Sequence, residues 1–308
     1  MNESVHFIPV GFDFERLIFP ISKGELEADR VVLITHEDKP SDFDSEDKSA
    51  ARLAENLTRR LDTSFEMIDK NTDKLRITQN ELYDYEEIYQ IAYEQLLKEL
   101  QEGNEVSVNI SSMPRTVAFG FATAADTLIT EKKDDIEDIR GRLRTYYVRP
   151  QKYVTLEMLE ELKREVRYLG ELDDSQAEER QEQLQSLINK VEDGGVTEGT
   201  KNPPGSDKMY VEFPASPGSD IEGFEEDILY FLSEKGPFPS ISDLAKTFAE
   251  YEGVQYGDSY RSRVQYNVSN LEEKGYVTQQ EAGNRVETRI STMGRMWVKT
   301  HPKTLPDV

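Results

Sequence analysis

The sequence predicts an α/β protein: a Rossmann-like parallel sheet, then a helical connector, then a C-terminal winged helix-turn-helix domain. Three observations support this fold class. Strand and helix patterns alternate through the first 150 residues, which is typical of a parallel sheet with helices on both faces. Helical periodicity without strands follows. Three helical patterns and a hairpin pattern complete the chain. We therefore expect domains at residues 1–150, 151–220 and 221–303.

The first domain is expected to contain five short strands and four helices. Residues 31–35, Val-Val-Leu-Ile-Thr, form a β-branched run of the kind found in strands buried on both faces. Between residues 81 and 100, leucines and tyrosines recur at steps of three and four, the period of an amphipathic helix. The predicted strands are residues 5–11, 31–35, 65–68, 106–110 and 143–148, and the predicted helices are residues 14–21, 47–61, 81–100 and 115–129.

The helix at residues 115–129 is unusual because small and apolar residues occupy every side of it. A helix that is apolar all round is buried all round. We expect one side to pack on the sheet and the other on a partner. A homodimer also suits a protein that reads palindromic DNA with one helix from each subunit.

The connector is predicted to hold two helices. Thr155 can cap a helix at 155–169, and a more charged helix is expected at 175–191. These helices fit either a solvated connector or a dimer element. Residues 194–220 are rich in Gly, Pro, Ser and Asp, the signature of a linker, with a short strand expected at 209–213.

The third domain shows three helices, a hairpin and a closing helix. The first helix begins near Phe224 and stops at Gly236-Pro237, and Ser240 or Ser242 can cap the second. A third helix is expected at 259–274. Strands at 276–280 and 285–290 flank Ala282-Gly283-Asn284 and predict a hairpin. A closing helix at 291–300 completes the pattern.

The third helix of this domain is the predicted DNA-reading element. Val264, Val268 and Leu271 define its inner side, and polar or basic residues occupy the rest. From Gly253 to Lys303 the chain holds eight Lys/Arg against five Asp/Glu, which favours double-stranded DNA as the partner. Winged helices also serve as protein-interaction modules, the alternative for this domain. The predicted DNA contacts are Arg261, Ser262, Arg263, Gln265, Tyr266 and Ser269, with Asn284 and Arg285 at the hairpin tip.

Composition narrows the function further. The 308 residues include no cysteine, which excludes disulfides and thiolate metal sites. The three histidines are scattered, which disfavours a His-dependent triad. We predict no metal and no cofactor. No apolar stretch is long enough to cross a membrane and no signal peptide is evident, so a cytoplasmic protein is expected. The net charge of −24 resembles that of proteins from salt-accumulating halophilic archaea; an ordinary acidic mesophilic protein is the alternative.

A candidate anion site follows the fourth predicted strand. Ser111 and Ser112 stand in the turn after it, and Arg115 and Thr116 begin the next helix. Hydroxyls, a guanidinium and free backbone N–H groups at a helix start can surround an anion. The carboxyl ends of strands in a parallel sheet are also where doubly wound folds bind ligands. The alternative is a structural cap with an arginine in solvent.

The segment Asn109-Ile-Ser-Ser-Met-Pro-Arg-Thr116 resembles the strand-four motif of CRISPR-associated Rossmann-fold (CARF) domains. The layout resembles CRISPR-linked archaeal regulators and a related set of haloarchaeal transcriptional regulators. This resemblance implies a cyclic oligoadenylate or similar nucleotide ligand. Met113-Pro114-Arg115 departs from the family, which has a Gly-rich turn and often a lysine there. The residues implied in ligand binding are Gly11, Phe12, Asp13, Asn109, Ser111, Ser112, Met113, Arg115 and Thr116.

These observations predict a transcriptional regulator and not an enzyme. The chain has no GxGxxG, P-loop or GxSxG motif. Some CARF domains resemble ring nucleases, which leaves an enzymatic alternative: cleavage of a cyclic oligonucleotide without a metal. In that alternative, Ser111, Ser112 and Arg115 position a ribose hydroxyl, and His36 or Asp13 serves as acid or base.

Overall fold

The structure is a computed structural model that describes residues 2–36, 47–112, 114–172, 174–194, 221, 223–282 and 285–303. The chain divides into two compact units, one formed by Met1–Val148 with Val211–Val308 and the other by Arg149–Tyr210. The strand expected at 209–213 and most of the expected linker lie outside the described residues.

The first unit contains a five-stranded parallel sheet, which confirms the predicted α/β class. Its strand order is β3-β2-β1-β4-β5. The central strand β1 pairs on one side with β2 and on the other with β4, so that Val5 lies between Arg30 and Val106. The strands are β1 (Ser4–Pro9), β2 (Arg30–His36), β3 (Asn71–Ile77), β4 (Glu105–Asn109) and β5 (Leu143–Tyr146).

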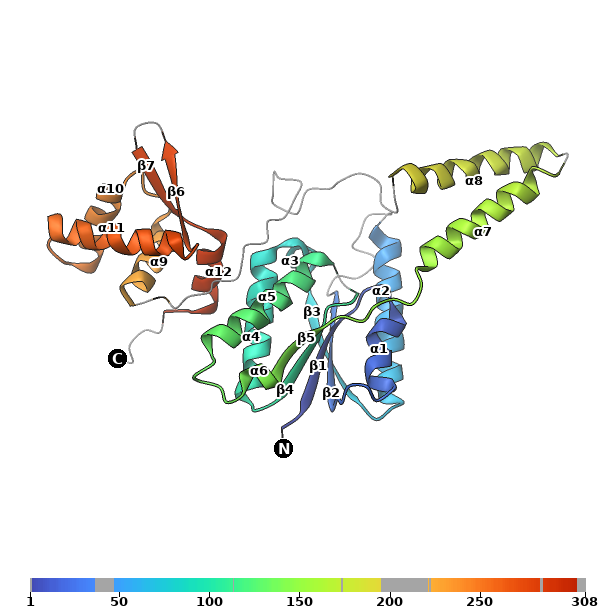
Figure 1. The fold of residues 1–308 in the computed structure, drawn as a ribbon, viewed down its shortest axis with the longest axis horizontal. Coiled ribbons are helices and arrows are strands. Elements are labelled where there is room, and N and C mark those ends of the chain that lie inside the picture. Colours follow the sequence, from blue (N-terminus) through green and yellow to red (C-terminus); the bar gives the residue numbers. More distant parts are fainter. Residues whose placement is uncertain are drawn as a thin grey trace. The chain divides into compact units, whose positions relative to one another are not determined.

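Helices cover both faces of this sheet (Figure 1). Helices α1 (Phe14–Ser22) and α2 (Asp47–Glu66) pack on one face, where a cluster of buried aliphatic residues includes Ile8 and Leu33. Helices α4 (Tyr85–Gln101) and α5 (Arg115–Glu131) pack on the other face against Phe7 and Val108. Successive β-branched and aromatic residues of β1 and β2 therefore serve two cores in alternation.

The third strand was placed wrongly from the sequence, at residues 65–68. Helix α2 continues to Glu66, and Phe65 is a fully buried residue of its last turn. Phe65 stands four residues after Leu61, so it extends the helical stripe that Leu61 belongs to. The observed β3 is an edge strand whose buried residue is Ile77, so it has no apolar run from which it could be recognised.

The helix expected at 81–100 is two helices, α3 (Gln79–Tyr83) and α4. Thr78 and Glu81 form a reciprocal capping box at the start of α3. The backbone of Asp84 is extended, and its carboxylate accepts hydrogen bonds from the N–H groups of Glu86 and Glu87. This second N-cap separates the two helices. A short helix that the sequence did not predict, α6 (Ile139–Arg142), precedes β5.

Close packing of α4 on α5 explains the small residues of α5. A Cβ atom built on Gly120 would overlap the Ile88 side chain, which is fully buried. The glycine therefore lets the two helix backbones approach each other. The burial that the sequence assigned to a partner is thus partly supplied by α4, while Phe119 remains half-exposed. Dimerisation stays a prediction.

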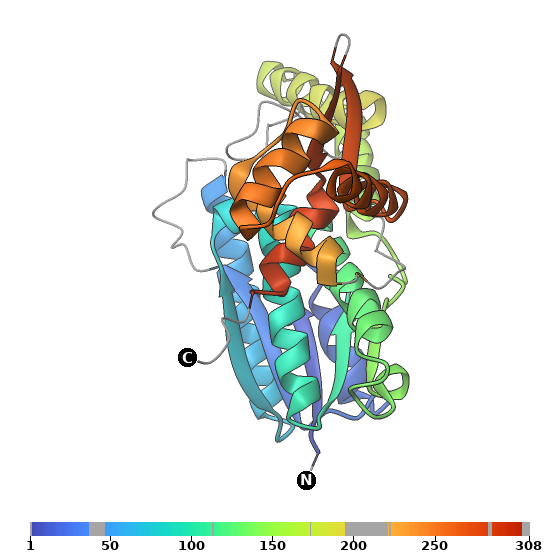
Figure 2. The same cartoon turned by 90° about the vertical axis from the view of Figure 1, so that its left-hand side faces the viewer.

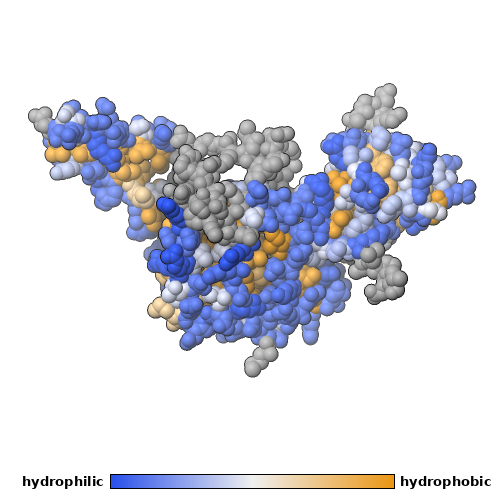
Figure 3. Space-filling view, turned by 180° about the vertical axis from the view of Figure 1, so that it is seen from behind, coloured by the Kyte–Doolittle hydropathy of each residue, from blue (hydrophilic) through white to orange (hydrophobic). Residues whose placement is uncertain are grey.

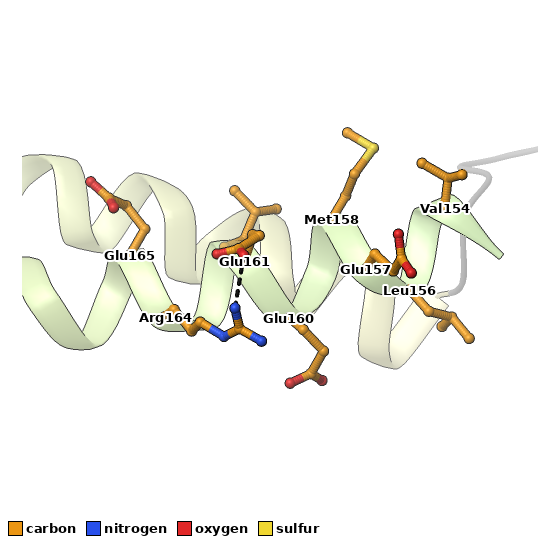
Figure 4. A pocket seen from close by; sticks show the side chains of 9 residues that line it. Val154, Leu156, Glu157, Met158, Glu160, Glu161, Arg164 and Glu165 are labelled. Carbon is orange, nitrogen blue, oxygen red and sulfur yellow. Dashed lines mark hydrogen bonds and ion pairs between the residues drawn. The ribbon is translucent and has the colours of Figure 1, made fainter. Parts of the chain in front are cut away.

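The second unit is a helical hairpin of α7 (Val154–Leu169) and α8 (Ser175–Gly194). Its core consists of Val166, Leu184 and Ile188 with partly buried leucines around them. The N-cap of α7 is Tyr153, without a side-chain cap, so the predicted capping by Thr155 is wrong. Nine residues of α7 line an open surface pocket, and Figure 4 shows their side chains spread around a single helix. None of them is a predicted site residue.

The C-terminal elements follow one another as three helices, a hairpin and a closing helix. They are α9 (Gly223–Lys235), α10 (Ile241–Glu252), α11 (Asp258–Glu273), β6 (Val277–Ala282), β7 (Arg285–Ile290) and α12 (Thr292–Thr300). Their core is aromatic: Phe231 and Phe248 are fully buried with ring centroids 5.0 Å apart. The β6–β7 hairpin is antiparallel and extends beyond these helices (Figure 2).

Helix α12 links these elements to the sheet-covering helices within the first unit. Met296 is fully buried in the same apolar cluster as residues of α4 and α5. Arg295 Nη2 lies 2.6 Å from Glu86 Oε1, and Lys299 forms an ion pair with Glu87. One buried apolar side chain and two ion pairs therefore help to join α12 to α4, and His301 at the end of α12 adds contacts with Tyr93 of α4 and Glu131 of α5.

The surface is consistent with the strongly acidic composition. The face in Figure 3 is mainly hydrophilic, with small separate hydrophobic areas. Among the described residues, no helix is both long and apolar enough to span a membrane.

Candidate functional site

The carboxyl ends of β1 and β4 mark the topological switch point of the sheet. Strands β2 and β3 continue from β1 in one direction, while β4 and β5 occupy the other side. Ligands of open α/β sheets bind outside the carboxyl ends of the strands at such a point. The loop at Gly11–Asp13 follows β1 and the turn at Ile110–Ser112 follows β4. The structure thus brings both sequence-predicted segments to one edge.

Two serine hydroxyls hold the loops of this edge together. Ser112 Oγ accepts a hydrogen bond of 3.1 Å from the backbone N–H of Asp13 in the β1 loop. Ser111 Oγ accepts one of 2.7 Å from the backbone N–H of Val148, which follows β5. Both serines are buried. Their hydroxyls therefore position three loops, and a direct ligand contact by either serine stays a prediction.

The β1 and β4 loops lie so close together that position 11 must be a glycine. A Cβ atom built on Gly11 would overlap the backbone carbonyl of Ser112. Because backbone cannot move aside as a flexible side chain can, any larger residue at Gly11 forces the β1 and β4 loops apart.

Asn109 and Thr116, both predicted to contact the ligand, are turned into the fold. Asn109 is fully buried, donates from Nδ2 to the Arg16 carbonyl at 3.1 Å and accepts from the Ser111 N–H at 2.9 Å. Thr116 Oγ1 donates to the Leu82 carbonyl at 2.6 Å, which ties the start of α5 to α3. The structure gives both residues a positioning role.

Arg16 is a central residue of this edge that the sequence reasoning missed. Its Nη1 lies 2.8 Å from the Asp13 carboxylate and its Nε donates to the Val148 carbonyl at 2.8 Å. Its guanidinium carbon also lies 5.0 Å from the centre of the Tyr147 ring. The signal in the sequence is only a helix residue three positions after Asp13, which predicts a local ion pair and no more. The contacts of Arg16 with Val148 and Tyr147 are visible only in the tertiary structure.

Three of the remaining side chains at this edge face solvent. Phe12 is 62% exposed and Tyr147 is 58% exposed. Arg115, in the first turn of α5, is also exposed, and Pro114 caps that helix without a side-chain hydrogen bond. Arg115 therefore lies in a first helical turn that has no side-chain cap, and both features suit anion binding. Met113 and the side chain of His36 lie outside the described residues.

A polar pair, one ring buried and the other partly buried, lies in β1 and β5. His6 is fully buried; its Nε2 donates to the Glu27 carbonyl at 2.9 Å, which leaves Nδ1 to accept from the Tyr146 hydroxyl at 3.2 Å. Burial lowers the pKa of His6 to about 4, and the charge of Arg144 adds to this, while the Glu27 carbonyl opposes it. Burial likewise raises the pKa of Tyr146. Both rings are therefore neutral at pH 7 and stiffen the sheet under the loops.

Helix α11 separates an inner apolar side from an outer polar side. Val264, Val268 and Leu271 are fully buried, while Tyr266 is 67% exposed. One predicted contact residue is partly engaged: the guanidinium carbon of Arg263 lies 3.7 Å from the centre of the Phe224 ring. The sequence-predicted residues Arg261, Ser262, Arg263, Gln265, Tyr266 and Ser269 are all exposed. Asn284 and the side chain of Arg285 lie outside the described residues.

The basic residues between Gly253 and Lys303 offer less available positive charge than their number suggests. Five of the eight Lys/Arg side chains form ion pairs within the chain, so only part of their charge is available to phosphates. These pairs join Lys274 to Glu225, Arg289 to Glu287, Arg295 to Glu86, Lys299 to Glu87 and Lys303 to Asp227.

Comparison with known proteins adds a family match for the α/β part. Residues 4–153 match the family model described as "HFX_2341_N:-like, N-terminal". A search of curated proteins found no match. Among solved structures, Enterococcus italicus Csm6 bound to cyclic hexa-2'-fluoro-hexa-dAMP is 13% identical, with a TM-score of 0.34, over 90% of this chain and 78% of its own. Since this likeness is weak in both sequence and shape, nothing about the ligand of this chain follows from it.

Proposed function

We propose that this protein is a DNA-binding transcriptional regulator whose α/β domain binds an anionic nucleotide of the cyclic oligoadenylate kind. The observation that carries the proposal is the division of α11, with Val264, Val268 and Leu271 fully buried and all six predicted contact residues of this helix exposed. A helix of this kind, third in a three-helix unit and followed by a hairpin, is the arrangement that winged helices place in the major groove.

The electrostatics of the chain favour base reading over charge-driven binding. The net charge is −24, and five of the eight basic side chains between Gly253 and Lys303 are already paired. Non-specific DNA binding depends on free cations that release counterions from phosphates. Contacts from Gln265 and Tyr266 to base edges must therefore supply much of the affinity. A homodimer, which doubles these contacts on a palindromic site, belongs to the proposal.

The nucleotide part rests on the switch-point edge. Arg115 and the uncapped start of α5, which follow β4, offer an anion site. Phe12, which follows the neighbouring strand β1, is an exposed aromatic residue. The contacts support binding without cleavage. The Asp13 carboxylate is paired with Arg16, and the hydroxyls of Ser111 and Ser112 already accept backbone N–H groups.

The DNA part is tested by fluorescence anisotropy at high salt with two duplexes, one from the protein's own promoter region and one random. We expect Tyr266→Ala to weaken promoter binding about tenfold and to leave random binding unchanged, because a base contact is worth roughly 1–3 kcal/mol. Arg261→Ala should weaken both alike. Arg59→Ala, an exposed arginine of α2, is the matched control. Equal losses on both duplexes for Tyr266→Ala would contradict base reading, and binding to neither would leave protein interaction as the function.

The ligand part is tested with cyclic tetra-adenylate added to the same assay. We expect the nucleotide to shift the promoter affinity of the wild type and not that of Arg115→Ala, because that variant lacks the exposed guanidinium of the edge. Linear products after incubation would instead identify a ring nuclease. An unchanged promoter affinity at saturating nucleotide would refute ligand control.

A further inference from the structure

Tyr147 stands at the switch-point edge with its ring half-exposed and its backbone fixed. The carbonyl of Tyr146 accepts from the Ile110 N–H at 2.9 Å, and the N–H of Val148 donates to Ser111 Oγ at 2.7 Å. Both neighbours of Tyr147 are therefore held to the β4 turn. Tyr147 is nevertheless 58% exposed, so an aromatic residue is presented to solvent from an anchored segment.

Arg16 is the support of this ring and not an anion ligand. Its guanidinium carbon lies 5.0 Å from the Tyr147 ring centre, and its side chain is only 14% exposed. Its charge is matched by Asp13 at 2.8 Å, and its Nε is used by the Val148 carbonyl. A cation held over an aromatic face attracts the ring and restricts its rotation. The exposed part of Tyr147 is therefore pre-oriented before any ligand arrives.

We infer that Tyr147 is a base-stacking platform, the group at this edge that recognises the nucleobase of the ligand. The inference rests on the proposed nucleotide-binding function and extends its site to the β5 loop. Arg115 would meet the phosphate, and the Tyr147 ring would stack on the base. Stacking accepts any base because every base has a π face, so the choice among bases depends on other contacts.

Stacking is tested by isothermal titration of cyclic tetra-adenylate, AMP and ribose 5-phosphate against four proteins. These are the wild type, Tyr147→Phe, Tyr147→Leu and Tyr147→Ala, each checked by circular dichroism. Tyr147→Phe should bind like the wild type because it keeps the ring. Tyr147→Leu keeps apolar bulk without a π face, and both it and Tyr147→Ala should bind the two adenylates about tenfold to a hundredfold more weakly, with no change for ribose 5-phosphate. Tyr168→Ala, an equally exposed tyrosine on α7, is the control.

The outcomes separate this inference from the function it rests on. If the wild type binds the adenylates and Tyr147→Ala binds them equally well, the platform is refuted while nucleotide binding stands. Wild-type binding of AMP no tighter than that of ribose 5-phosphate also refutes it, because the base then contributes nothing. If the wild type binds none of the three compounds, the proposed ligand function fails and the platform with it.

Discussion

At the scale of single residues, the polar groups of the switch-point edge hold loops together more than they face solvent. Ser111, Ser112, Asn109 and Thr116 each bond a segment distant in sequence, such as Ser112 to Asp13 across 99 residues. A buried hydroxyl or amide must find partners, and these side chains supply them to backbone groups that no strand satisfies. Rigid loops then leave Phe12, Asp13, Arg115 and Tyr147 among the exposed groups, with the Asp13 carboxylate paired to Arg16.

His6 predicts a specific pH dependence of stability. Its pKa falls from 6.5 in the unfolded chain to about 4 in the fold, so the unfolded state binds the proton first as pH drops. The stabilisation is complete above about pH 6.5 and is lost progressively between pH 6.5 and 4. Each pKa unit is worth about 1.4 kcal/mol, so the loss from His6 is about 3 kcal/mol.

The measurement is the free energy of unfolding from urea titrations at constant salt, for the wild type and His6→Gln. The variant should be less stable at pH 7, and its curve should fall less steeply between pH 6.5 and 4. The carboxylates titrate in both proteins, so the difference between the two curves isolates His6. Parallel curves over this range would show that His6 is not held neutral.

At the scale of elements, strong periodicity located most helices. Weak patterns led to a misplaced third strand and to a missed break between α3 and α4. Helices α5 and α11 begin within one residue of their predicted starts. Strand β3 escaped detection because an edge strand with polar faces has no apolar alternation. The break between α3 and α4 escaped it because Asp84 sits inside an otherwise continuous helical pattern. In that case a local capping hydrogen bond outweighs periodicity.

Packing of α4 on α5 gives a prediction at this scale. Alanine in place of Gly120 gains up to about 1 kcal/mol in helix propensity but overlaps Ile88, and overpacking a buried site costs about 1–3 kcal/mol. We expect Gly120→Ala to lower stability. In the Ile88→Ala background the overlap is gone, so the same change should raise stability. The measurement is the urea midpoint of the wild type, Gly120→Ala, Ile88→Ala and the double variant. Stabilisation by Gly120→Ala in the wild-type background would refute close helix contact.

At the scale of the whole molecule, charge pairing leaves fewer basic side chains available to DNA than the composition suggests. The basic side chains of α12 bond acidic residues of α4, up to 212 residues away in sequence, instead of remaining available to DNA. Surface ion pairs contribute little and are screened by salt, whereas a buried apolar contact is not. The attachment of α12 to α4 should therefore depend on Met296 when salt is concentrated.

This predicts a difference between variants in small-angle X-ray scattering. Arg295→Ala with Lys299→Ala should enlarge the radius of gyration at low salt and have no effect at molar salt. Met296→Asn should enlarge it at both, because it places an amide in a fully buried apolar site. Arg289→Ala is the control, since that arginine pairs with Glu287 inside the C-terminal hairpin. Identical behaviour of the double variant at the two salt concentrations would contradict an ion-pair contribution.

The sequence by itself determined the α/β class, the β1 and β4 loops as a candidate site, and the polar outer side of α11. The fold class, the β4 turn and the outer side of α11 follow from periodicity and turn chemistry, which act between neighbours in the chain. The β1 loop was implied by the resemblance to CARF domains. Only the tertiary structure decided that Arg16 and Tyr147 belong to the same edge, that Ser111 and Ser112 position loops, and that most C-terminal cations are paired. Those facts depend on contacts between segments tens to hundreds of residues apart, which no local pattern encodes.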